Sequence, residues 1–528
     1  MADTESPEQL VDRLVRNVAP IEIALNHAWW DSYTSSSAEA DARRESLELQ
    51  WRDAHADPDD FAAIRAARNT GGLDADVRRQ LVILHDRFVP QQVPAGLREK
   101  LVGLETEVDS AFTNSRGEID GRPVDDNEIA KILRTSDDGD ERRRAWEASK
   151  QVGALVGDRV RELARLRNEA ARALGYRDHY ALALATGDLD EDRLLSTLAE
   201  VEAVTTGPFR AWKEQLDARL APRFGVAVDD LRSWHYDDPF FQELPVSGRV
   251  DLDELFADAD LEDLTRRTYR GIGLDVDPVL ERSDLLPRAG KSQHAFCIDV
   301  DREGDVRVLA NIAGNERWAE TMLHEFGHAV YDVSQDRDRP WLLRGPTHAL
   351  TTEAVAMLFG RLARDPVWLA AIAGVDRDRL QSLDRGLRAS KAASLLVSVR
   401  WMLVMITFER ELYADPDADL DARWWDLVER FQLVTRPDGR RAPDWAAKIH
   451  LASAPVYYQN YLYGEMVASQ LDASLEAEAG GIVDRRDAGS FLVERVFRPG
   501  ASLRWDELVE SATGTPLSAS HLARDITS

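Results

Sequence analysis

Residues 317–333 read RWAETMLHEFGHAVYDV. Apolar residues recur at three- and four-residue steps, which predicts one amphipathic helix. His324 and His328 are four residues apart, so an α-helix places both side chains on one face. Glu325 follows the first histidine, and apolar residues such as Phe326 surround the polar group. The stretch predicts a buried helix with a functional polar face.

This spacing suits zinc chemistry. Two neutral imidazoles can bind one zinc ion, and a catalytic zinc site keeps one position open for water. Glu325, one step round the helix, is placed to take a proton from that water. The alternative is a polar patch on an ordinary helix. The apolar surroundings disfavour it, because buried polar groups need partners.

A catalytic zinc site needs a third protein ligand. Glu353 lies in THALTTEAVAMLFGRL, a predicted apolar helix that Thr351 or Thr352 can cap. A lone carboxylate on such a helix is expected to bind metal or to form a buried salt bridge. His348 is the alternative ligand, in a predicted loop. The expected cofactor is one zinc ion per chain, held by His324, His328 and Glu353.

The composition excludes several classes of protein. The chain has 528 residues with 44% hydrophobic and 30% charged content, which is typical of a globular protein. A net charge of −29 argues against nucleic-acid and membrane partners. Cys297 is the single cysteine, and the N-terminal MADTESPEQL lacks the features of a signal peptide. We expect a cytoplasmic protein.

Helical patterns dominate the rest of the chain. Residues 8–32 and 141–174 are predicted helices, and Gly175 follows the second one, where a helix often ends. The apolar run at 392–408 is too short for a membrane span and contains Arg400, so it predicts a buried helix. Residues 294–312 predict a strand, an acidic turn and a second strand.

These elements predict an all-α fold with a small β-hairpin beside the zinc helix. No linker divides residues 1–528 into independent domains. We therefore expect a single domain with two helical lobes. The N-terminal lobe is predicted over about residues 1–285, and the hairpin and C-terminal lobe over about 286–528.

The HEFGH motif, with Glu353 standing 25 positions after His328, resembles the gluzincin peptidases. Two branches of these enzymes compete. One is the angiotensin-converting-enzyme type of peptidyl dipeptidase, and the other is the thimet-oligopeptidase and oligoendopeptidase F type. The 25-residue step matches the oligopeptidases, since the converting enzymes use one residue fewer.

Four other stretches resemble the converting-enzyme branch. They are RLRNEAARALGYRDH at 165–179, the pair His294-Ala295, AAKIHLASAPVYYQNY at 446–461, and WDELVESATGTPLSASHL at 505–522. The resemblance implies a helical ellipsoid whose two lobes enclose a deep channel, with zinc on its floor. It also implies that His294 and Ala295 line the substrate, although His294 could instead cap the hairpin.

The resemblance assigns roles within residues 446–461. Lys448 would bind the C-terminal carboxylate of the substrate, helped by Tyr458. His450 and Tyr461 would donate to the oxyanion. One extra residue precedes Tyr458, so Tyr457 is an alternative for its role. Lys448 and His450 share a face only where the backbone is extended or irregular. A surface position for Lys448 is the plain alternative.

The sequence also departs from the converting-enzyme pattern. Met357 stands where that family has an aspartate, so another residue must accept a ring proton from a zinc histidine. We match the family's carboxylate-binding glutamine to no residue of this sequence. Trp424 matches an aromatic residue of the family's chloride sites, but Val428 and Asn460 replace two arginines. Chloride activation is therefore not expected.

Three functions are compatible with these patterns. The first is a zinc peptidase that releases C-terminal dipeptides from short peptides, with Glu325 as the general base. The second is an oligoendopeptidase that cleaves internal bonds of short peptides. The third, from another class, is a non-catalytic helical protein that binds zinc for stability. Glu325 disfavours the third, because a structural zinc site needs no base.

Overall fold

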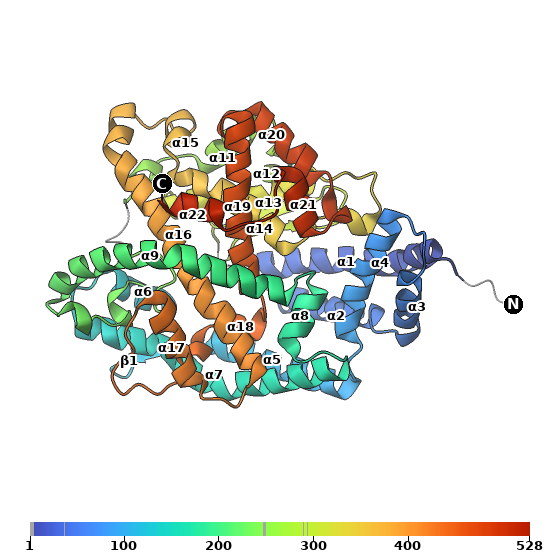
Figure 1. Cartoon of the computed structure of the whole chain (residues 1–528), viewed down its shortest axis with the longest axis horizontal. Coiled ribbons are helices and arrows are strands. Elements are labelled where there is room, and N and C mark those ends of the chain that lie inside the picture. Colours follow the sequence, from blue (N-terminus) through green and yellow to red (C-terminus); the bar gives the residue numbers. More distant parts are fainter. Residues whose placement is uncertain (1–4, 36, 246–249, 289, 293, 528) are drawn as a thin grey trace.

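The computed structural model describes residues 5–35, 37–245, 250–288, 290–292 and 294–527, so residues 1–4 of the N-terminal stretch lie outside the described part. Over these ranges the chain forms 22 α-helices and two two-stranded sheets. The predicted all-α class is thus confirmed. Figure 1 shows the helices coloured along the chain.

The first part of the chain forms the following helices: α1 (Pro7–Ser35), α2 (Ala38–Ala54), α3 (Pro58–Arg68), α4 (Ala75–Phe88), α5 (Ala95–Asn114), α6 (Asp126–Thr135), α7 (Gly139–Ala173), α8 (His179–Thr186), α9 (Glu191–Phe224), α10 (Asp253–Phe256), α11 (Leu261–Gly271) and α12 (Asp277–Arg282). The predicted helices at 8–32 and 141–174 correspond to α1 and α7. Helix α7 ends before Gly175, whose φ of +89° suits glycine.

The remaining helices are these: α13 (Glu316–Val333), α14 (Ala349–Gly360), α15 (Pro366–Ala371), α16 (Arg377–Ala414), α17 (Leu420–Gln432), α18 (His450–Ser453), α19 (Tyr458–Ala479), α20 (Arg486–Leu492), α21 (Trp505–Thr513) and α22 (Ser520–Thr527). In Figure 1, α5, α7, α17 and α18 lie in the lower half, whereas α13, α14 and α19–α22 lie in the upper half. Helix α16 runs between the two halves.

Helix α16 contains the apolar run 392–408. It is the one helix among the described residues that is long and apolar enough to cross a membrane, and 78% of its most apolar window is buried inside the fold. Arg400 is 2% exposed, and its Nε donates to the carbonyl of Phe431 at 2.5 Å. The prediction of a buried helix is confirmed.

The predicted hairpin is also present. Strand β3 (Phe296–Asp299) pairs antiparallel with β4 (Val306–Leu309), with Phe296 opposite Leu309. Helix α1 covers this hairpin, and the ring of its Tyr33 lies 5.4 Å from the ring of Phe296. The amide of Asn26 donates to the carbonyl of Val300 at 3.1 Å. A smaller hairpin, β1 (Gly117–Ile119) and β2 (Arg122–Val124), lies elsewhere.

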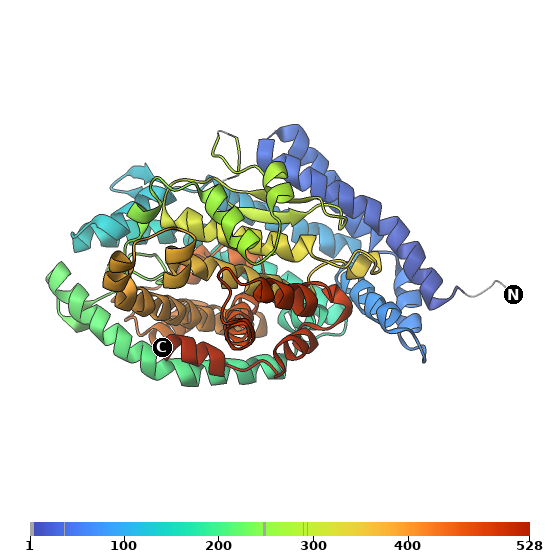
Figure 2. The ribbon, with the colours of Figure 1, turned by 90° about the horizontal axis from the view of Figure 1, so that it is seen from above.

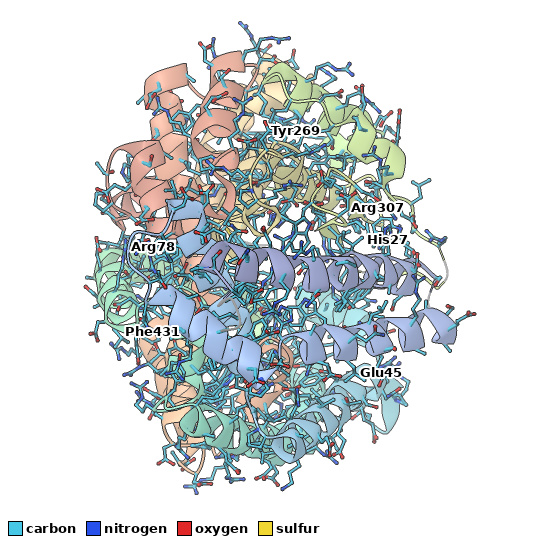
Figure 3. All side chains as sticks on the ribbon, turned by 90° about the vertical axis from the view of Figure 1, so that its right-hand side faces the viewer. His27, Glu45, Arg78, Tyr269, Arg307 and Phe431 are labelled. Carbon is cyan, nitrogen blue, oxygen red and sulfur yellow. The ribbon has the colours of Figure 1, made fainter. Side chains whose placement is uncertain are left out.

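The N-terminal helices cover one side of the molecule. Figure 3 shows α1 and α2 side by side on this face, with His27 of α1 near Arg307 of the hairpin. Figure 2 shows the yellow segment that contains α13 in the interior, between these blue helices and the red C-terminal ones. The HEFGH helix is therefore a central element of the fold.

Candidate active site

The HEFGH helix and the Glu353 helix pack very closely. A Cβ atom on Gly327 of α13 would lie 2.8 Å from the Cα of Ala356 on α14, so only glycine permits this approach. The glycine of the motif thereby brings α14 near enough for Glu353 to reach both histidines. The sequence analysis did not assign this role to Gly327.

The three predicted metal ligands meet at this helix pair. One ligand atom each from His324, His328 and Glu353 lies within 4.8 Å of the other two. The Nε2 atom of His324 is 3.8 Å from Oε2 of Glu353. The histidine rings lie 5.0 Å apart at 83° to one another. Two imidazoles and one carboxylate form a donor set that suits a catalytic zinc ion.

Hydrogen bonding orients one of these histidines. With its proton on Nδ1, His328 donates to Oγ1 of Thr352 over 2.6 Å, which leaves Nε2 free for a metal. Thr352 thus supplies an acceptor for a zinc histidine where Met357 cannot. The sequence had proposed Thr352 as a helix cap instead.

The helix cap is in fact His348, which corrects the prediction of Thr351 or Thr352. Its Nδ1 accepts a hydrogen bond from the backbone N–H of Leu350 at 3.0 Å. Its Nε2 donates to the carbonyl of Gly187. Since both ring nitrogens are engaged, His348 is not available as a third ligand. Threonine is a more common N-cap residue than histidine. Here the hydrogen bond to the carbonyl of Gly187 holds the His348 ring at the start of the helix.

His324, His328 and Glu353 together form the metal-binding group, and burial shifts the pKa of each of them. It lowers the pKa of His324 to about 4, and burial followed by His324 lowers the pKa of His328 well below its usual value. Both rings are therefore neutral, which is the form that binds metal. Burial raises the pKa of Glu353 to about 7. A carboxylate placed here lacks a compensating cation, and a divalent ion would supply one.

Glu325 has the environment of a general base. It is 8% exposed, and it accepts a hydrogen bond from the backbone N–H of Cys297. Burial, followed by the charge of Glu353, raises the pKa of Glu325 to about 8. The side chain lies on the same helix as both histidines and lines one cavity together with both of them.

Two cavities adjoin the metal-binding group. The first, of about 640 Å³, is lined by His324 and Glu325 together with Gln242 and Thr321. The second, of about 610 Å³, is lined by all three predicted ligands, Glu325, Ala295 and Tyr461. His324 and Glu325 therefore lie between two cavities, each of which could hold one end of a bound peptide.

Only one residue of the predicted substrate-lining pair His294-Ala295 lines a cavity. Ala295 precedes β3 and lines the second cavity. His294 is exposed and is not part of the lining of either cavity. Its backbone N–H donates to Oγ of Ser292 at 3.3 Å. The hairpin thus brings its edge to the cavity through Ala295 rather than through the imidazole.

Two consecutive tyrosines face different partners. The hydroxyl of Tyr457 donates to Oε1 of Glu353 at 3.3 Å. The hydroxyl of Tyr458 accepts a hydrogen bond from Nε1 of Trp401 at 3.2 Å. Tyr461 lies between them, with ring distances of 5.1 Å to Tyr457 and 5.5 Å to Tyr458. Tyr457 therefore contacts the metal-binding group through Glu353, whereas Tyr458 lies in a neighbouring site.

That neighbouring site is built around Lys448. Its ammonium donates to Oε1 of Gln242 at 2.7 Å and lies 6.0 Å from the centre of the Tyr458 ring. The amide nitrogen of Gln242 donates in turn to Asp238 at 3.2 Å, which fixes the orientation of the amide. The ring of His450 lies 5.1 Å from the ring of Tyr458, at 52° to it. Lys448 is partly buried, so the surface alternative does not describe it.

Gln242 was missed by the sequence analysis. It lies in irregular chain after α9, about 200 residues from Lys448, and no local pattern links the two. The backbone at Lys448 is extended, after a short 3₁₀ turn at Asp444–Ala447. This irregular geometry agrees with the condition set for Lys448 and His450 to share a face.

The comparison with protein families agrees with this site. Residues 281–527 match Peptidase family M3, a family of zinc metallopeptidases, and the match includes the HEFGH helix and Glu353. No curated protein matches the chain. The protein is a zinc metallopeptidase, and the described residues contain one group that could hold the metal, which disfavours the non-catalytic alternative. The match does not distinguish release of C-terminal dipeptides from internal cleavage.

Proposed function

We propose that this peptidase releases dipeptides from the free C-termini of short peptides. One observation carries the proposal: Lys448 and Gln242 form a hydrogen-bonded pair, and Gln242 lines the same cavity as His324 and Glu325. A lysine ammonium in partly buried surroundings offers a strong site for a carboxylate. A terminal carboxylate bound there would place the C-terminal end of the peptide in the first cavity.

His324, His328 and Glu353 would hold the zinc ion. When bound, zinc makes a water nucleophilic near neutral pH and polarises the carbonyl of the scissile bond. The remaining work falls to protein side chains. Glu325 would accept the proton of the attacking water, hold it in buried surroundings and deliver it to the leaving amine.

Tyr461 would donate its hydroxyl proton to the oxygen that gains negative charge. Its position in the cavity lining beside Glu353 supports this role, and one well-placed donor contributes about 2.7–4 kcal/mol to catalysis. The resemblance gives His450 a shared role with Tyr461 at the oxyanion, and the ring of His450 lies 5.1 Å from the ring of Tyr458. We therefore assign His450 to the wall of the Lys448 site, together with Tyr458.

The upstream part of the peptide would occupy the second cavity. Ala295 stands there immediately before the edge of β3, and an edge strand can pair its backbone with an extended peptide. Such pairing gives affinity with little demand on side chains. His294, being exposed, is not assigned a role in this binding.

A digest of one peptide tests the proposal. An N-terminally blocked octapeptide is supplied with either a free or an amidated C-terminus, and products are identified by mass over time. We expect successive loss of dipeptides from the free form and much slower cleavage of the amide. Equal cleavage of both forms at one internal bond would instead establish the oligoendopeptidase function, which the 25-residue step favours.

A further inference from the structure

The segment that carries the substrate-binding candidates, residues 448–461, contains an unfavourable backbone conformation. Val456 has a φ of +55°, a region that β-branched residues rarely adopt. Tyr457 and Tyr458 follow it directly and face Glu353 and Trp401 respectively. The turn at Val456 therefore determines where both tyrosine hydroxyls lie.

Two side chains hold this turn. Oε1 of Glu409, on α16, accepts a hydrogen bond from the backbone N–H of Val456 at 2.7 Å. The amide of Gln459 donates to the carbonyl of Val456. Glu409 and Gln459 are each 2% exposed, so no solvent replaces these bonds. Buried hydrogen bonds of this kind can maintain a strained backbone.

A second buried side chain holds the same segment a few residues earlier. The guanidinium of Arg167, on α7, donates to the carbonyls of Leu451 and Ala452, which follow His450. Arg167 is 5% exposed and also pairs with Glu105 at 2.8 Å. It lies in the RLRNEAAR stretch, to which the proposed chemistry assigns no direct role.

The two holding residues belong to one packed unit. Arg167 donates to the hydroxyl of Tyr413 on α16 at 3.2 Å, and its neighbour Asn168 donates to the carbonyl of Tyr413 at 2.8 Å. Hydrogen bonds thus link α7 to α16 close to the positions from which both helices contact residues 448–461. Buried polar groups that are hydrogen-bonded favour one geometry, because other arrangements leave them without partners.

We propose that Glu409 and Arg167 are positioning residues that fix residues 448–461 in the shape required for substrate binding. Neither side chain lines the two cavities beside the metal-binding group. Their effect is transmitted through the backbone: Arg167 sets the chain after Lys448 and His450, and Glu409 sets the chain before Tyr457 and Tyr458. The inference rests on the proposed function of the Lys448 site.

Variants at Glu409 separate positioning from simple folding. Glu409→Gln keeps an acceptor for the Val456 N–H, whereas Glu409→Leu fills the space without one. Glu411→Leu is the matched control, because Glu411 lies on the same helix but pairs with Arg423 near the surface. The measurements are kcat/KM, affinity for an unreactive product dipeptide by calorimetry, zinc content and thermal unfolding.

We expect Glu409→Leu to lower kcat/KM and dipeptide affinity about 10- to 100-fold, since small displacements of binding groups have effects of this size. Zinc content should stay near one per chain. Glu409→Gln and Glu411→Leu should resemble the unaltered protein. Arg167→Met should repeat the loss, and Arg167→Lys, which can still donate to the carbonyls, should recover part of it.

Equal losses in Glu409→Gln and Glu409→Leu would overturn the proposal, as would normal dipeptide affinity in a folded Glu409→Leu protein. If Glu409→Leu yields little folded protein, the Gln459→Met variant tests the proposal in its place. It removes the donor to the Val456 carbonyl and should weaken dipeptide binding, so unchanged binding would contradict us. A lack of preference for free C-termini in the unaltered protein would instead defeat the proposed function alone.

Discussion

Helices α13 and α14 carry the metal-binding group at regular helical positions, whereas residues 448–461 carry the substrate-binding candidates on irregular backbone. On α13 the spacing of His324 and His328 suffices to put them together. In the second region Lys448 is itself extended, and a short helix and a turn with positive φ separate it from Tyr458.

The difference shows how each region depends on the rest of the fold. Regular helices satisfy their own backbone hydrogen bonds, so α13 needs only a close neighbour such as α14. Irregular backbone must find partners elsewhere, and residues 448–461 find them in Arg167 and Glu409. Substitutions in the first region should therefore act on metal and chemistry, and those in the second on substrate binding.

The largest effect is expected at Glu325. Glu325→Gln removes the base and leaves the three metal ligands, so kcat/KM should fall about 10²- to 10⁴-fold, the contribution of general acid–base catalysis. Zinc content, measured by mass spectrometry of the purified protein, should remain near one per chain. Near-normal turnover, or loss of the metal, would contradict the assignment.

Glu353→Ala is the control for this experiment. It removes a ligand while retaining the base, so the purified protein should contain much less zinc. Retention of the metal in this variant would show that another residue completes the site.

Thr352→Val should have the next largest effect. The substitution removes the oxygen that receives the Nδ1 proton of His328 and preserves the shape of the side chain. Loss of such a supporting hydrogen bond lowers metal affinity about 10- to 100-fold. Competition with a chelator measures the affinity. Thr351→Val, one residue earlier on α14, is the matched control, and equal affinities in both variants would refute the role of Thr352.

Lys448→Met should act on substrate binding alone. A charge-assisted hydrogen bond contributes about 1.5–3 kcal/mol, so the preference for free over amidated peptides should fall at least about 10-fold. Zinc content should not change. The test compares kcat/KM for the two peptide forms. A uniform decrease for both would argue that Lys448 supports the fold instead of binding the carboxylate.

The same preference should depend on pH. Burial lowers the pKa of Lys448 to about 8, while Asp238 and Glu243 favour its charged form. Below pH 8 the ammonium binds the substrate carboxylate, which stays ionised throughout, and above pH 8 the charge is lost. The ratio of kcat/KM values should therefore decline as pH rises through about 8. A constant ratio between pH 6.5 and 9.5 would exclude this titration.

Chloride should have the smallest effect, namely none. The buried Lys150 lies near Trp424 and Val428, and burial lowers the pKa of its ammonium to about 7, although the carboxylate of Asp444 favours the charged form. Asp444 already accepts two hydrogen bonds from Arg440, at 2.7 and 2.6 Å. An added anion would face this resident negative charge. Activity at fixed ionic strength, with chloride exchanged for a large inert anion, should be constant, and steep activation would refute the prediction.

The sequence by itself determined the helical fold, the hairpin before the zinc helix and the metal-binding group. These features follow from local rules. The period of apolar residues defines α1, α7, α13 and α16, and the four-residue step aligns His324 with His328. Glu353 was recognisable because a lone acid on an apolar helix requires a partner.

Only the tertiary structure decided the contacts between distant segments. It paired Gln242 with Lys448 and His348 with the carbonyl of Gly187, and it directed Tyr457 and Tyr458 to different partners after the Val456 turn. No periodicity predicts these contacts, since each depends on how two helices or loops meet. The backbone groups of an irregular segment bond to side chains from other parts of the chain. Which side chains come close enough depends on how the whole chain packs.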